Sequence, residues 1–330
     1  MACWPSAPRS CPARRAPTPR SSSTSAPSPP RARPGWTSSS GSRRRSRPKS
    51  GGRINVILRP PGMMGEVEMV REVRKGERLQ ACGVSAGALA EGGNVPQMSL
   101  VELPFLFKTD AEADYVLDNV LFDPYAELLA KRGFVFAIWS ENGWRSFATK
   151  GQPILTPADL PKFKMRAQES ALHLQMYQLF GVAAVQKPMT EVLTSLQSNV
   201  IDGLDNTALF IQSAGLADAL DHFTVTRHMY QPAVIVFGKR WFDTLPPDLQ
   251  KLLLSKKSLG PGGRAAIRTM DDAMVGNFDG MGVEVHRLTD AQREAFAVIA
   301  RKMHDSYAAG IEGGPDLLAK IRAGIAKAPK

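Results

Sequence analysis

Short apolar runs that suit β-strands alternate with segments that suit amphipathic helices from residue 51 onward. This alternation restricts the possible folds more than any other feature of the sequence. Residues 134–139 and 234–237 are typical buried strands, whereas residues 65–74 carry Val67, Val70 and Val73 at helical spacing. Strands that alternate with helices usually form parallel βαβ units, in which ligands bind at the carboxyl ends of the strands. The pattern therefore predicts an α/β fold.

The remaining predicted elements follow the same alternation. Further strands are predicted at residues 53–58, 81–85, 163–166, 183–186 and 200–205. Further helices are predicted at residues 110–121, 124–132, 169–180 and 188–197, from residue 245 onward, and at 264–277. We expect the run Gly260-Pro261-Gly262-Gly263 to interrupt the last of these helical regions as a kink or a loop.

The first fifty residues differ from the rest of the chain. They contain 10 Pro, 13 Ser and 11 basic residues, but no acidic residue. Too few apolar side chains are present to offset the entropy of ordering, so we expect residues 1–50 to be disordered and outside the fold. A nucleic-acid-binding arm is an alternative interpretation. We favour a third hypothesis, a stretch translated in a shifted reading frame, because GC-rich codons read out of frame give Arg, Pro, Ser and Ala.

Charge and cysteine content exclude several classes of protein. The chain has 42 basic and 31 acidic residues, so residues 51–330 hold 31 of each and are formally neutral. A basic surface for nucleic acid is therefore not expected there. Cys3, Cys11 and Cys82 form no disulfide or metal-binding pattern, and no two His have metal-ligand spacing, so no metal or cofactor is predicted. No apolar run is long enough to span a bilayer, and no secretory signal peptide is recognisable.

An ordered set of short segments over residues 62–250 carries a family resemblance. The segments are Gly62-Met63-Met64-Gly65-Glu66, Leu103-Pro104-Phe105-Leu106-Phe107, Gly143-Trp144-Arg145, Pro153 to Leu160, Lys164-Met165-Arg166, Pro188 to Val192, Asp202 to Asn206, His228 to Pro232, and Trp241 to Pro246. In order and spacing they resemble the solute-binding subunits of tripartite ATP-independent periplasmic (TRAP) transporters, the DctP-like family.

The resemblance implies a two-lobed fold of the periplasmic-binding-protein type, with parallel or mixed sheets flanked by helices and a hinge between the lobes. We place lobe one at residues 51–143 plus 232–271 and lobe two at residues 144–231 plus 272–330. It implies a protein that is not an enzyme: it captures a small organic acid in the periplasm and delivers it to the small and large membrane permease subunits. It implies neither a nucleic-acid partner nor stable insertion into a membrane.

Ligand-binding residues are also predicted from the resemblance. Arg166 corresponds to the family's Arg that binds the ligand carboxylate through two parallel N–H donors, a geometry that suits a guanidinium. Arg145 and Asn206 match further ligand-contacting positions. From the residues alone, an Arg at the end of an apolar strand is more often a structural ion-pair partner, and Asn206 could equally cap a turn.

Three weaker candidates complete the predicted site. Trp144 and Trp139 are candidates for the cleft wall, although Trp139 could equally belong to the core. Glu66 follows the Gly-rich turn but could simply complement a helix dipole. The alternative functions are an α/β enzyme acting on a small carboxylate and a ligand-sensing regulator with a basic arm.

Overall fold

The structure is a computed structural model that describes residues 50–59 and 63–329. These residues lie within one compact unit, Ser38–Lys330. The hypotheses of disorder and of a shifted reading frame concern residues that lie, apart from Ser50, outside the described part of the chain.

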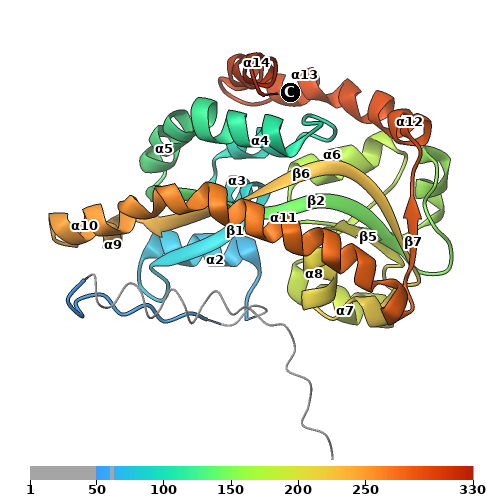
Figure 1. Ribbon diagram of the computed structural model, residues 1–330, viewed down its shortest axis with the longest axis horizontal. Helices are drawn as coiled ribbons and strands as arrows, with labels where there is room; N and C mark the ends of the chain where they lie inside the picture. The colour runs from blue at the N-terminus through green and yellow to red at the C-terminus, as the bar shows by residue number, and fades with distance from the viewer. Residues whose placement is uncertain (1–49, 60–62, 330) are drawn as a thin grey trace, which may run out of the picture. The chain divides into compact units, whose positions relative to one another are not determined.

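Strands and helices alternate along the described chain, as expected (Figure 1). The strands are β1 Ala81–Ser85, β2 Phe134–Thr149, β3 Met165–Ala167, β4 Val185–Gln186, β5 Gly203–Asn206, β6 His222–Gly238 and β7 Glu284–Arg287. The α-helices are α2 Glu66–Lys75, α3 Ala86–Gly93, α4 Asp110–Val116, α5 Phe122–Lys131, α6 Ala171–Leu179, α7 Met189–Gln197, α8 Ala208–Ser213, α9 Lys239–Phe242, α10 Pro247–Leu254, α11 Gly260–Asn277, α12 Asp290–Ala300, α13 His304–Ala309 and α14 Gly314–Ile325.

The strands of the described residues form one mixed sheet in the order β1-β6-β2-β5-β3-β4, and β7 also pairs with β6. At its centre lie β2 and β6, an antiparallel pair of 16 and 17 residues. Only the pairs β3 with β4, β3 with β5, and β6 with β7 are parallel. The expectation of parallel units is thus wrong for the central strands, and the mixed sheet named as its alternative is found.

Strands β2 and β6 are longer than the sequence indicated because β-bulges allow their hydrogen-bonded pairing to continue past polar residues. Register shifts occur between Phe136 and Ile138, between Glu141 and Gly143, and between Arg145 and Phe147. Gly143 has φ of 107°, a conformation that favours glycine. The bulges let Ser140–Gly143, which has the composition of a turn, remain in the sheet.

Helices cover the sheet and also connect distant parts of the chain. Helix α11 packs along β2, and α14 returns to pack against α4 (Figure 1). Gly324 of α14 allows this close approach, since an added Cβ would lie 2.9 Å from Val120 Cγ2 and 3.0 Å from Val116 Cγ2. The C-terminal helices therefore brace helices that lie two hundred residues earlier in the sequence.

Buried apolar side chains form two clusters among the described residues. The larger one includes Val70, Leu100, Phe134 and Trp139, and the smaller one gathers around Leu204, Phe223 and Phe278. The larger cluster also contains Tyr177, so it has members on both sides of the predicted lobe boundary. The lobe boundaries remain a prediction.

Two predicted local features differ from the structure. Residues 53–58 are irregular, and Ile57 and Leu58 remain 61% and 49% exposed. The run Gly260–Gly263 is the first turn of α11, with Pro261 among its first two residues. Proline is tolerated in a first turn because its missing N–H would have no helical partner, so the run begins a helix and does not break one.

None of the helices in the described ranges combines the length and the apolar character needed to cross a membrane.

Candidate functional site

Arg166 is a buried cation on β3, between the backbones of β4 and β5. Its residue is 3% exposed, and its Nε and Nη2 donate to the Lys187 carbonyl oxygen at 2.9 and 2.6 Å. Within residues 50–59 and 63–329, no carboxylate forms an ion pair with it. Burial, and then repulsion from Arg145, lower the pKa of Arg166 to about 10, although Asp205 acts in the opposite direction. In the described part of the chain, this guanidinium thus has no carboxylate within ion-pair distance, although Asp205 and Glu66 attract it from farther away.

Arg145, on β2, is in the opposite situation. It is 1% exposed, and its Nε donates to Asp205 Oδ2 at 2.5 Å while Nη2 donates to the Asp205 backbone oxygen. Burial alone would lower the pKa of Arg145, but Asp205 outweighs it and raises that pKa. Its charge is therefore neutralised inside the fold.

The carboxylate of Asp205, on β5, also contacts side chains other than Arg145. Tyr177 Oη donates to Asp205 Oδ1 at 2.8 Å, and His228 Nε2 lies 3.4 Å from Oδ2. Burial would raise the pKa of Asp205, but Arg145 and the two neighbouring histidines, His228 and His173, hold it well below its usual range. This carboxylate is the charged centre of a buried polar cluster.

A chain of hydrogen bonds connects Arg145 with the start of two helices. Arg145 Nη1 donates to Gln168 Oε1 at 3.1 Å and to Gln231 Oε1 at 2.9 Å, and Gln168 Nε2 donates to Ser85 Oγ at 2.8 Å. Ser85 caps α3, and its N–H and hydroxyl donate to the carboxylate of Glu66, the first residue of α2, at 2.9 and 2.8 Å. Burial raises the pKa of Glu66, and these bonds from Ser85 counteract it.

The predicted residue Asn206 lies beside this network. Its Oδ1 accepts from the Thr207 N–H at 2.9 Å and lies 3.4 Å from Arg145 Nη1, while Nδ2 is 3.6 Å from the sulfur of Met189. The amide nitrogen therefore has only a weak partner among the described residues. This agrees with the local, turn-capping interpretation of Oδ1 and leaves the donor available.

The two predicted tryptophans have different surroundings. Trp144 Nε1 donates to Asp110 Oδ1 at 2.6 Å, and the Arg227 guanidinium lies 4.7 Å from the centre of its ring. Trp139 is 1% exposed and packs edge-on against Phe136 at 4.9 Å in the larger core cluster. Neither indole has a described contact with Arg166, and their ligand roles stay predictions.

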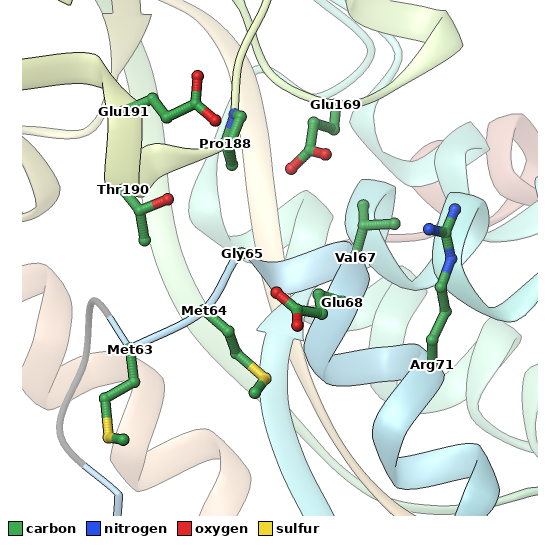
Figure 2. A pocket seen from close by; sticks show the side chains of 10 residues that line it. All are labelled: Met63, Met64, Gly65, Val67, Glu68, Arg71, Glu169, Pro188, Thr190 and Glu191. Atoms are coloured by element: carbon green, nitrogen blue, oxygen red, sulfur yellow. The ribbon is translucent and has the colours of Figure 1, made fainter. Parts of the chain in front are cut away.

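An open cavity of about 300 Å³ lies between the start of α2 and the start of α7 (Figure 2). Three carboxylates and one guanidinium are the charged groups of its wall: Glu68 and Arg71 on α2, Glu169 after β3 and Glu191 on α7. Burial raises the pKa of Glu169, whereas Arg166 and Arg71 counteract that rise. Arg166 does not line the cavity itself, but Glu169 follows it by three positions, and its hydrogen-bond partner Lys187 directly precedes Pro188 of the cavity wall.

Residues 44–310 match the sequence profile of the DctP family, bacterial extracellular solute-binding protein, family 7. The chain belongs to this family. DctP-family proteins are periplasmic and are the substrate-binding subunits of TRAP transporters, which act with membrane permease subunits. The family, the mixed α/β fold and the periplasmic location implied by the sequence resemblance are confirmed.

Three relatives illustrate this membership. The 2,3-diketo-L-gulonate-binding periplasmic protein YiaO of Escherichia coli is 30% identical over 275 residues, 82% of each protein. The galactonate complex of the sugar acid binding protein DctPAm of Advenella mimigardefordensis superposes with a TM-score of 0.82 at 23% identity and covers 88% of this chain and 93% of that one. A TRAP solute-binding protein of Xanthobacter autotrophicus with bound β-D-galacturonate gives a TM-score of 0.75 at 26% identity, with coverages of 84% and 91%.

Several residues of the network in this DctP-family chain were not among the predicted site residues. Gln168 could have been found, since it follows Arg166 by two positions and so points to the same face of an extended chain. Ser85 carried a signal as well, since it ends the predicted strand at residues 81–85 and Ser is a preferred helix N-cap. Asp205 and Tyr177 are separated by 28 residues, and no local pattern brings them together.

Proposed function

We propose that this chain captures a small polyhydroxylated monocarboxylic acid in the periplasm and delivers it to a TRAP permease. One observation carries the proposal: Arg166 is a buried guanidinium without an ion-pair partner in the described residues, and its hydrogen-bond partner Lys187 directly precedes Pro188 in the wall of an open cavity. A buried charge without a counter-ion is costly, so a ligand carboxylate would gain from filling that role.

The chemistry of the neighbours favours Arg166 over Arg145 as the carboxylate anchor. A planar guanidinium can offer two parallel N–H donors to a carboxylate, which adds both strength and orientation. Arg145 has already directed its donors to Asp205, Gln168 and Gln231. We therefore assign the ligand carboxylate to Arg166 and a supporting role to Arg145.

The cavity wall argues for hydroxyl groups on the rest of the ligand. Glu68, Glu169 and Glu191 present carboxylate oxygens, which accept hydrogen bonds from hydroxyls. These three carboxylates outnumber Arg71, the basic side chain in the same wall, and so disfavour a second ligand carboxylate. The relatives agree with this inference, since their names specify 2,3-diketo-L-gulonate, galactonate and β-D-galacturonate.

Capture would involve closure of the two predicted lobes without chemical change of the ligand. Strands β2 and β6 run continuously through the sheet, and the bulge at Glu141 and Gly143 lies at the predicted end of the first segment of lobe one. Closure over the acid would exclude water and strengthen its contact with Arg166. The buried acids and bases here are already joined in ion pairs and hydrogen bonds, which suits binding better than catalysis.

A thermal-shift screen of the full chain tests the proposal. The panel contains sugar acids, uronic acids, succinate and a neutral polyol, each added to the parent chain, Arg166→Ala and Arg166→Lys. The control is Arg322→Ala, which removes an exposed arginine paired with Asp305. At 100 times its Kd, a ligand stabilises the fold by about 2.7 kcal/mol.

We expect a sugar acid to raise the Tm of the parent and of Arg322→Ala, but not of Arg166→Ala, with Arg166→Lys in between. The neutral polyol should have no effect, and the acid should be recovered unchanged by mass spectrometry. Equal shifts with and without Arg166 would contradict the assigned anchor, and a chemically altered acid would favour the enzyme alternative.

A further inference from the structure

Two histidines that are 64 residues apart in the sequence meet at one edge of the sheet. Strand β7 lies beside the start of β6 (Figure 1). The two strands pair in parallel, with His222 opposite Glu284 and Thr224 opposite His286. His222 Nδ1 lies 3.1 Å from His286 Nε2, and the Glu284 carboxylate lies 3.5 Å from the first nitrogen and 3.7 Å from the second. Two imidazoles and one carboxylate therefore converge on one point, which sequence spacing alone could not indicate.

These separations suit a single small metal ion. Zinc ligands bind at about 2.0–2.1 Å in a tetrahedral arrangement, which separates neighbouring ligand atoms by about 3.3–3.4 Å. The three observed distances, from 3.1 to 3.7 Å, bracket that value. An ion could occupy the centre with only small side-chain rotations, and the 67% exposed Glu284 side chain is free to make them.

The hydrogen bond on the far side of His222 gives independent support. His222 Nε2 lies 3.2 Å from the Gly151 carbonyl oxygen, which can only accept a hydrogen bond. The proton of a neutral His222 must then reside on Nε2, so Nδ1 presents its lone pair toward His286 and Glu284. Metal-binding histidines typically have this arrangement, in which a carbonyl fixes the tautomer. The Gly151 N–H in turn donates to Asp221 Oδ2 at 2.7 Å, which fixes the turn.

We propose that His222, Glu284 and His286 bind one divalent transition-metal ion of the zinc class, with solvent in the fourth position. Two nitrogens and one oxygen suit Zn²⁺, whereas Ca²⁺ and Mg²⁺ prefer all-oxygen sites. The ion would tie β7 to β6 and to the Gly151 turn. A simple His–His hydrogen bond is the competing explanation.

The metal site is separate from the proposed acid site. Across the sheet, His222 pairs with Thr149 of β2, Thr149 with Gly203 of β5, and Gly203 with Met165 of β3, which directly precedes Arg166. Three strand spacings, roughly 14 Å, therefore separate the metal site from the row of Arg166. Metal binding and acid binding should therefore be independent, and each proposal can fail alone.

The rest of the chain offers a favourable background for a metal titration. The sequence has five His, and the other three, His173, His228 and His304, are 0%, 1% and 5% exposed. Cys82 is also buried. Cys3 and Cys11 lie outside the described residues, so both are replaced by Ser in every protein to be compared.

The experiment is an isothermal titration of the metal-free full chain with ZnCl₂. We expect one Zn²⁺ per chain, no response to CaCl₂ or MgCl₂, and a visible cobalt spectrum typical of tetrahedral coordination. His222→Gln and His286→Asn should each lower the Zn²⁺ affinity by about 100-fold or more, because even changes around the ligands typically cost about 10- to 100-fold. Glu294→Gln, which alters a carboxylate with 54% side-chain exposure on another element, should change nothing.

One gain-of-function variant guards against a folding defect in the His variants. Glu284→His changes an exposed side chain and supplies a third imidazole, so it should bind Zn²⁺ more tightly than the parent. Absence of Zn²⁺ binding by the parent, equal affinity in the His variants, or no gain from Glu284→His would each overturn the metal site and leave the His–His hydrogen bond as the explanation.

Discussion

Replacing Arg145 and Arg166 by Met, one at a time, should separate an arginine that stabilises the fold from an arginine that is available for a ligand. The two side chains have the same chemistry, and both are at least 97% buried. They differ in their partners: Arg145 is joined to Asp205, whereas Arg166 donates only to the Lys187 carbonyl oxygen among the described contacts. Met has a similar length and no charge, so the comparison isolates the charge.

The structure gives the expected magnitudes. Arg145→Met leaves the Asp205 carboxylate, which is 0% exposed, without its main counter-charge, and breaking such a buried pair costs about 3–5 kcal/mol. Arg166→Met removes a buried guanidinium whose pKa is lowered to about 10. At about 1.4 kcal/mol per pKa unit, keeping this group charged costs the folded state about 3 kcal/mol, which the substitution would recover. The lost hydrogen bonds to the Lys187 carbonyl are worth about 1.5–3 kcal/mol. The two contributions for Arg166 nearly cancel.

Urea unfolding of the acid-free proteins, followed by tryptophan fluorescence, measures these free energies. We expect Arg145→Met to lose about 3–5 kcal/mol and Arg166→Met to change by less than about 1 kcal/mol. A double variant with Asp205→Asn should recover part of the loss in Arg145→Met, because no buried charge remains unpaired. If Arg166→Met were as destabilising as Arg145→Met, Arg166 would have an internal partner and the reasoning for the anchor would be refuted.

Two further predictions concern stability. In a thermal scan, Gly238→Ala should lower the free energy of unfolding by about 1–3 kcal/mol, because an added Cβ would lie 2.1 Å from the Val73 carbonyl oxygen. The control is Gly262→Ala in α11, whose added Cβ would meet no atom within 4 Å. It should be neutral or slightly stabilising in the same scan. Burial raises the pKa of Glu141 from 4.5 to about 7, although Arg268 counteracts that rise. The folded state therefore binds the Glu141 proton more tightly than the unfolded state does. The resulting contribution to the free energy of unfolding is complete below about pH 4.5 and should be lost as the pH rises to about 7. Thermal scans across that range should therefore show a weaker pH dependence for Glu141→Gln than for the parent, and identical profiles would contradict the prediction.

The sequence predicted those helices and strands whose apolar pattern is contained within the element itself. Helix α2 follows from Val67, Val70 and Val73 on one face, and the strand expected at residues 81–85 is β1 as found. Residues 53–58 also alternate, but alternation indicates only that a segment could pair. A strand needs a neighbour elsewhere in the chain, and a local window contains no information about that neighbour.

The central strands required knowledge that the sequence pattern lacks. Ser140–Gly143 has turn composition, so a strand ending at Trp139 was the natural inference. In the structure, β6 pairs with β2 on both sides of a bulge at this point and keeps the polar residues in the ladder. Because the bulge is stabilised by a partner strand about ninety residues later, tertiary pairing overrides the local turn preference here.

For a similar reason, the sequence indicated some residues of the candidate site but not their partners. Arg166, Arg145 and Asn206 came from the ordered motifs of the family, and the structure places the three on adjacent strands. The motifs did not indicate that Arg145 is already paired, because its partner Asp205 is 60 residues away. Residue type and position along a strand suggest which side chains face a cleft, whereas the partners that neutralise them depend on the complete fold.

The pairing of Arg145 explains how Arg166 can remain available. Asp205 is the buried acid whose attraction acts most strongly on Arg166, and it acts on Arg145 as well. Its carboxylate is oriented by Arg145 through Oδ2 and by Tyr177 through Oδ1. An acid with both oxygens occupied can moderate the field around Arg166 without forming an ion pair with it. A single carboxylate thus attracts two neighbouring guanidiniums and pairs with only one of them. This asymmetry supports the proposal that Arg166 binds the carboxylate of a ligand.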